Sequence, residues 1–83
     1  MKRDDILRQA ETLINGARAA DYGDAKENFQ NIADLWSVYL GTTVSPQDVA
    51  VCMIMVKAAR LMTSDKSDSW IDICGYAALG GEK

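Results

Sequence analysis

Apolar residues recur at the spacing of an α-helix along most of the chain, and no segment alternates with the period of a β-strand. The first helix is predicted from about Arg3 to Ala19. The turn that follows contains Gly23, which can take a positive φ, and Asp24, which we expect to be the N-cap of a second helix. Gly41 is predicted to end that second helix as its C′ glycine.

The third helix has the clearest start signal in the chain. Ser45 is the predicted N-cap, Pro46 occupies the first helical position, and Asp48 stands where a capping-box acid belongs. A stretch rich in hydroxyls and aspartates ends this helix, and Ser67 is the predicted N-cap of a fourth. That helix should stop at Gly80–Gly81. The fold class is therefore all-α, a compact domain resembling a four-helix bundle.

Apolar surface is abundant for a chain of this length. The third helix, Val49 to Met62, is apolar almost all round and is predicted to need neighbours on every side. The 83 residues, 48% of them apolar, form a single domain (1–83) with little room for a large private core. We therefore expect a homo-oligomer. The second helix should bury one stripe: Phe29, Ile32, Ala33, Trp36, Tyr39 and Leu40.

Composition excludes several classes of function. The net charge is −3 and the cations are scattered, so the sequence has no basic stripe. We therefore do not expect the protein to bind along a nucleic-acid backbone. The apolar run is too short to span a membrane, and no signal-peptide core follows the charged start, so we expect a cytoplasmic protein. Without histidine or a CxxC pair, the usual zinc sites and a histidine-based triad are excluded. Cys52 and Cys74 are expected to be buried free thiols.

Two cations interrupt the third helix. Lys57 and Arg60 lie within about 60° of each other on a helical wheel of about 100° per residue. In the fourth helix Asp68 and Asp72 share a face with Tyr76, while Trp70 and its apolar neighbours Ile73 and Ala77 should point the other way. One interpretation is an ion pair from Arg60 to Asp72 or Asp68, with Lys57 reaching water along its methylenes. The other is that both cations bind phosphate, and the aspartates orient them or hold a metal.

A polar line on the second helix leaves a similar choice. Glu27, Asn31 and Asp34 can be its solvated face, or Glu27 can join Asp68 and Asp72 in a magnesium site. Most aromatic residues, Trp36 among them, are predicted to be core. Tyr22 lies in a charged turn with no obvious core to join, so we expect it to contact a nucleobase.

Three segments carry a family resemblance: DYGDAKENFQNIADLW, SPQDVAVCMIMVKAARL and DSWIDICGYAALGG. They resemble a family of small phage and prophage proteins of unassigned function. The order of elements is similar to that of nucleotide-modification-associated helical domains and, more distantly, of MazG-like nucleoside triphosphate pyrophosphohydrolases. The resemblance covers Tyr22 to Gly81, and its shared elements are the YGD turn with ENF, the KxxR of Lys57 to Arg60, and the DxxxDxxGY of Asp68 to Tyr76.

The pyrophosphohydrolases hold magnesium with an EExxE helix and a later ExxD. Here the first motif is reduced to Glu27, Asn28 and Asn31, and the later acids Asp68 and Asp72 stand four apart. Hydrolysis of a phosphoanhydride in such a site needs several carboxylates to hold magnesium and activate water. The resemblance therefore favours binding of a nucleotide over its hydrolysis, although whether the protein is an enzyme stays open.

The resemblance implies a non-catalytic nucleotide-binding phage protein in the cytoplasm of an infected host cell. Lys57 and Arg60 would bind phosphate, Asn28 and Asn31 would meet the base edge, and Tyr22 and Tyr76 would complete a site between protomers. Small phage sponges of similar size sequester cyclic nucleotide signals of bacterial antiviral defence, which suggests one such role. The alternatives are a MazG-like hydrolase, which would use magnesium as its cofactor, and a structural helical interaction module.

Overall fold

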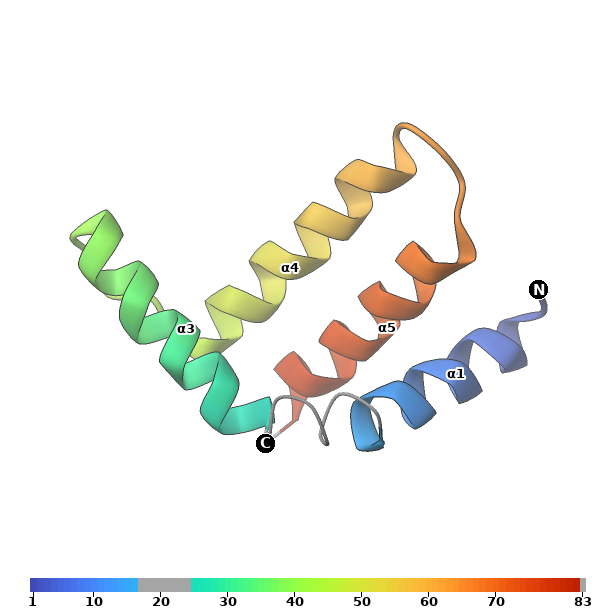
Figure 1. The fold of residues 1–83 in the computed structure, drawn as a ribbon, viewed down its shortest axis with the longest axis horizontal. Coiled ribbons are helices and arrows are strands. Elements are labelled where there is room, and N and C mark those ends of the chain that lie inside the picture. The colour runs from blue at the N-terminus through green and yellow to red at the C-terminus, as the bar shows by residue number, and fades with distance from the viewer. Residues whose placement is uncertain (17–24, 83) are drawn as a thin grey trace.

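The computed structural model describes residues 1–16 and 25–82, and within these ranges the chain forms four helices and no strand (Figure 1). They are α1 (Arg3–Asn15), α3 (Ala25–Leu40), α4 (Pro46–Leu61) and α5 (Ser67–Gly81). The all-α prediction is confirmed. No helix in the described ranges combines the length and the apolar character needed to cross a bilayer.

The predicted start of α4 is confirmed in its hydrogen bonds. The backbone N–H of Asp48 donates to Ser45 Oγ at 3.1 Å, and the N–H of Ser45 donates to Asp48 Oδ2 at 2.9 Å. This reciprocal capping box satisfies two backbone donors that would otherwise lack partners at the helix start. Gly41 ends α3 with a φ of +68°, and its N–H donates to the Ser37 carbonyl, as expected of a C′ glycine.

Two other boundaries differ from the predictions. Ser67 was expected to cap α5, but it is the first helical residue, and the N-cap is Lys66 without a capping side chain. Helix α1 begins at Arg3 as predicted and ends at Asn15. The prediction that this helix continues to Ala19 is wrong at Gly16, which is the C-cap and has non-helical backbone angles. Residues 17–19 and the expected cap Asp24 lie outside the described residues.

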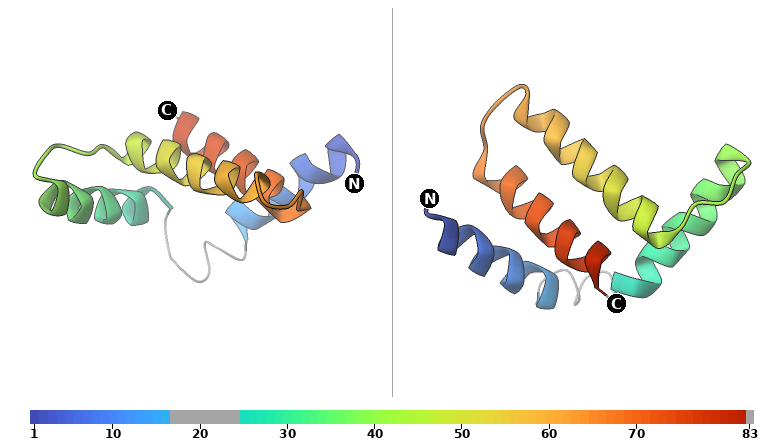
Figure 2. Two further views of the ribbon diagram at one scale, coloured as in Figure 1. Left: turned by 90° about the horizontal axis from the view of Figure 1, so that it is seen from above. Right: turned by 180° about the vertical axis from the view of Figure 1, so that it is seen from behind.

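Helix α5 lies between α4 and α1, and α3 packs against α4 (Figure 1). Helices α4 and α5 form an antiparallel hairpin, with α1 on the far side of α5 (Figure 2). The arrangement is bundle-like, but α4 has helices on only part of its circumference within the part of the chain that the structure describes. The prediction that α4 has neighbours on every side is therefore not met within a single copy.

The core joins α3, α4 and α5. Its buried members come from the first and middle turns of α3, the first two turns of α4 and the second half of α5: Phe29, Ala33, Val49, Ala50 and Tyr76. The rings of Phe29 and Tyr76 stack with centroids 6.3 Å apart and an interplanar angle of 28°. Trp36 is half-buried against this cluster, in line with its predicted core role.

The buried stripe predicted for α3 is wrong at its C-terminal end. Tyr39 is 89% exposed, and Leu40 is exposed as well. The reason is that the contacts of α3 with the core cluster end at Trp36, and its last turn extends beyond the helix that would cover it (Figure 1). Leu35 and Val38 on the same half of α3 are also exposed.

Candidate functional site

A partly buried ion pair links the two helices of the α4–α5 hairpin. Lys57 Nζ lies 3.0 Å from Asp72 Oδ2, and the two side chains are only 14% and 16% exposed. One of the two interpretations of the sequence paired Arg60 with Asp72 or Asp68 and placed the Lys57 ammonium in water, and this ion-pair assignment is wrong. Arg60 is exposed at the end of α4 and forms no ion pair within the described residues.

The hairpin is closely packed at its other end. A Cβ built on Gly80 would lie 2.7 Å from the Cβ of Ala50, so the backbone of α5 comes very near α4 there. The Gly80–Ala50 and Lys57–Asp72 contacts fit one antiparallel register. The ammonium and carboxylate are therefore presented to each other by two helices that are held in a fixed alignment.

Tyr76, one turn after Asp72, lies on the same side of α5, as the wheel predicts. That side faces inward, because Tyr76 is buried against Phe29. Trp70 and Ala77, which were predicted to point the other way, are exposed, and the Trp70 Nε1–H donates to Asp65 Oδ1 at 2.8 Å. Tyr76 therefore contributes to the core, whereas a ligand contact had been predicted for it.

A small hollow lies where α1 meets α5. It is lined by Leu13, Ile14, Asp72, Gly75, Tyr76 and Leu79, and its volume of about 10 Å³ is roughly the space that one water molecule needs. Gly75 allows α1 to approach, since a Cβ there would lie 3.1 Å from Ile14 Cγ2. Pockets that enclose drug-sized ligands usually measure about 300–1,000 Å³, so this hollow is too small to enclose a nucleotide.

The other predicted ligand residues are dispersed over the surface. Arg60 and Asp68 are exposed, one turn beyond the ion pair toward the connection between α4 and α5. Asn31 is exposed on α3, and Asn28 is half-buried next to Phe29. Tyr22 lies outside the described residues.

The predicted magnesium ligands are not brought together. Residues 1–16 and 25–82 contain no group of three or more acidic or cysteine side chains able to hold a metal ion. Glu27, Asp68 and Asp72 are all within these ranges, and Asp72 faces Lys57. On the same helix as Glu27, Asp34 is exposed and accepts a hydrogen bond from Gln30 Nε2 at 2.9 Å, as on a solvated face.

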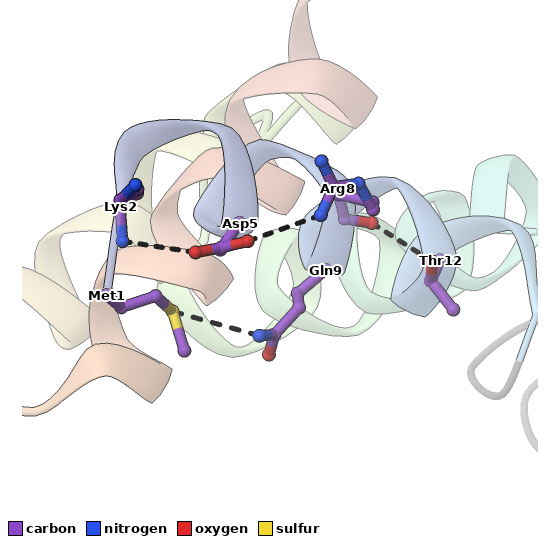
Figure 3. A network of polar contacts seen from close by, with 6 residues as sticks. All are labelled: Met1, Lys2, Asp5, Arg8, Gln9 and Thr12. Carbon is purple, nitrogen blue, oxygen red and sulfur yellow. Dashed lines mark hydrogen bonds and ion pairs between the residues drawn. The ribbon is translucent and has the colours of Figure 1, made fainter.

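A second ion pair, on α1, has a different setting (Figure 3). Arg8 Nη1 lies 3.2 Å from Asp5 Oδ1, but the two side chains are 70% and 42% exposed. Asp5 also accepts from the backbone N–H of Lys2, and Thr12 Oγ1 donates to the Arg8 carbonyl. These contacts all lie within one helix and its cap, so this network stabilises α1 locally and brings no distant segments together.

Sequence reasoning missed the two close helix approaches at Gly75 and Gly80. Gly80 was interpreted only as part of a helix stop. The available signal was the presence of glycines within an otherwise apolar helical pattern, which marks places where another backbone can come near.

Residues 5–83 match a protein family described as a domain of unknown function, DUF6378. The chain belongs to this family. This DUF6378 domain is similar to the Gene 55 protein of Mycobacterium phage L5, with 53% identity over 76 residues that cover 89% of this chain and 49% of the relative. The Gene 55 protein of Mycobacterium phage D29 is 45% identical over 75 residues, covering 89% of this chain and 50% of that protein.

The DUF6378 domain thus spans about half the length of the curated relatives that it matches. No solved structure matches it. The relatives confirm the predicted resemblance to small phage proteins of unassigned function. Neither the family nor the relatives support the more distant resemblance to MazG-like pyrophosphohydrolases.

Proposed function

We propose that this DUF6378 domain is a non-catalytic nucleotide-binding domain of a phage protein, with Arg60 as its main phosphate contact. The observation that carries the proposal is the division of roles between the two cations of α4. Lys57 is engaged by Asp72, whereas the Arg60 guanidinium is exposed one turn away and has no ion-pair partner among the described residues. A guanidinium presents five donors in a planar fork that suits phosphate oxygens.

The Lys57–Asp72 pair supports Arg60 in this role. It ties α4 to α5 in the turn next to Arg60, which limits the movement of the helix end that carries the guanidinium. A partly buried pair adds little net stability when its desolvation is counted, so positioning a neighbouring group is a reason for its presence. The KxxR element of the family resemblance contains both cations.

Binding is favoured over hydrolysis because the carboxylates are not gathered. Metal-dependent cleavage needs several oxygen ligands around magnesium, and Asp72 already faces an ammonium. The hollow beside α5 is too small for a nucleotide, so the base and sugar would lie on the open surface or between two copies. Asn28, Asn31 and Tyr22 remain the proposed contacts for the base. Sequestration of a cyclic nucleotide signal is the specific role that we propose to test.

The purified protein should be incubated with nucleoside triphosphates and cyclic dinucleotides in the presence of magnesium, then denatured, and the nucleotides separated by chromatography. Recovery of an intact bound nucleotide supports the proposal, and recovery of a cyclic dinucleotide supports the sequestering role. Release of monophosphate would instead establish a hydrolase. Neither retention nor turnover across the panel would rule out both functions.

Arg60→Ala tests the phosphate contact, with Arg8→Ala on α1 as the matched control, since both arginines are exposed. Loss of a charge-assisted hydrogen bond should weaken nucleotide binding by roughly 10- to 100-fold in the first variant and leave it unchanged in the second. Far-ultraviolet circular dichroism should show the same helical content in both. Equal affinities of the two variants would contradict the role of Arg60.

A second candidate function is a helical interaction module. The apolar end of α3 favours it, because Leu35, Val38, Tyr39 and Leu40 are all exposed there. Exposed apolar patches commonly mark sites where another protein binds. This function would be preferred if the nucleotide panel returns no ligand while Val38→Glu abolishes capture of a partner protein.

A further inference from the structure

One side of α4 is apolar and uncovered. Val51, Met55, Ala58 and Met62 follow one another at intervals of four, three and four residues, and all are exposed, Met55 by 57% and Met62 by 91%. Alternating intervals of three and four place side chains in one seam along a helix, and such seams pack against a second helix. We call these four residues the α4 seam.

The flanks of the α4 seam are uncharged beyond the capping box. On a helical wheel the positions beside the seam after the first turn of α4 are Ile54 on one edge and Cys52 and Ala59 on the other, and none is buried. The wheel also places Asp48 beside the seam, but its carboxylate is held in the capping box at the helix start. Lys57 lies toward α5, and Arg60 lies on the opposite side of the helix from the seam. The turns of α4 that follow its capping box therefore present a continuous apolar face to the surroundings.

Nothing else in the described residues covers this face. Helix α5 packs on the side of α4 that carries Lys57 and Ala50, and α3 packs on the side that carries Val49. Figures 1 and 2 show no further helix beside α4. A helix with this much exposed apolar surface is expected to have another neighbour.

We propose that the α4 seam is the site where a second copy of this chain packs, so that two α4 helices pair across a two-fold axis. The seam fits a helix with the same spacing, and α4 itself has that spacing. In a symmetric interface each patch meets itself, so charges on it would oppose like charges, and the α4 seam and its flanks have none beyond the capping box.

The area is adequate for such a pair. The side chains of the α4 seam and its flanks expose on the order of 500 Å² of apolar surface per copy. A symmetric pair that covered this surface completely on both copies would bury at most about 1,000 Å² in total, which is the lower limit for a specific interface. The interface is therefore expected to be a modest one whose population depends on protein concentration.

The test measures the molar mass by sedimentation equilibrium over a range of concentrations for the wild type and three glutamate variants. Met55→Glu places two like charges in the proposed interface and should raise the dimer dissociation constant more than about 100-fold. Leu7→Glu on α1 is the matched control, because Leu7 is also 57% exposed, and it should leave the dimer intact. Val38→Glu tests the apolar end of α3 and should also leave it intact.

A second measurement guards against misfolded variants. If dimer formation is linked to folding, the melting temperature of the wild type rises with protein concentration, and that of Met55→Glu does not. A wild type that stays monomeric at all concentrations would overturn the proposal. The partner of the α4 seam would then be sought in the part of the longer phage relatives that this chain does not match. A dimer that survives Met55→Glu, or that is lost only in Val38→Glu, would overturn it as well.

Discussion

The close contact between α4 and α5 at Gly80 leads to a quantitative prediction for Gly80→Ala. The new methyl carbon would lie 2.7 Å from the Cβ of Ala50, whereas carbon atoms in favourable contact are about 3.5–4.0 Å apart. Both atoms are attached directly to the backbone, so neither can rotate away, and the helices must separate by roughly 1 Å. Overpacking of this kind costs about 1–3 kcal/mol.

Alanine also favours the helix over glycine by up to about 1 kcal/mol, which offsets part of that cost. Gly81→Ala provides the control, because no atom lies within 4 Å of a Cβ at Gly81, and the gain in helix propensity is similar. Because this gain cancels between the two variants, we expect Gly80→Ala to be about 1–3 kcal/mol less stable than Gly81→Ala. For a domain of this size that difference corresponds to a melting temperature lower by roughly 5–25 °C.

Thermal unfolding followed by circular dichroism at 222 nm checks the difference, with all variants at one protein concentration. A Gly80→Ala protein that melts at or above the temperature of Gly81→Ala would refute the close approach of the two helices. The double variant Ala50→Gly with Gly80→Ala moves the methyl group to the other helix. It should recover part of the lost stability if the clash is the cause.

Two further substitutions test the ion pair and the cap. Lys57→Met leaves the partly buried Asp72 carboxylate without its ammonium and should cost about 1–3 kcal/mol in urea unfolding, whereas Arg8→Met breaks an exposed pair and should cost less than about 1 kcal/mol. Equal midpoints for these two variants would show that the α4–α5 pair has no structural role. Ser45→Ala removes the side-chain acceptor of the capping box and should lower stability by about 1 kcal/mol in the same assay, so an unchanged midpoint would contradict the cap.

Helix starts and ends were predictable where they depend on chemistry within a few residues. The Ser45 and Asp48 capping box and the positive φ of Gly41 are local, and both were confirmed. Ser67 was misplaced by one residue because several hydroxyl and aspartate side chains there can each serve as a cap. The structure uses none of their side chains for that purpose.

Burial was less predictable, because periodicity shows which residues share a face and not how far the neighbouring helix extends. Phe29 and Tyr39 belong to one predicted stripe, yet the first is buried and the second is almost fully exposed. The difference comes from the place where α3 crosses α4. That crossing is a property of tertiary packing, and no local pattern in α3 encodes it.

The candidate site was predictable to the level of its residue types. The helical wheels predicted that two cations and two acids face each other from adjoining helices. One cation–acid pair, Lys57–Asp72, is present in the structure. Which cation would meet Asp72 could not be decided, since Lys57 and Arg60 differ by only about 60° around the helix axis. The register of the hairpin decides it by placing Lys57 level with Asp72.

The register of the α4–α5 hairpin also distinguishes nucleotide binding from magnesium-dependent nucleotide hydrolysis. Asp72 Oδ2 is already paired with the Lys57 ammonium, so a magnesium ion on this carboxylate would place a second cation next to Lys57 in a partly buried interface. A phosphate at Arg60 needs no such exchange, because the guanidinium is exposed and has no ion-pair partner in the described ranges. Phosphate binding therefore uses the hairpin as it stands, while a magnesium ion would have to lie beside the Lys57 ammonium, with no group of three acidic side chains in the described ranges to hold it.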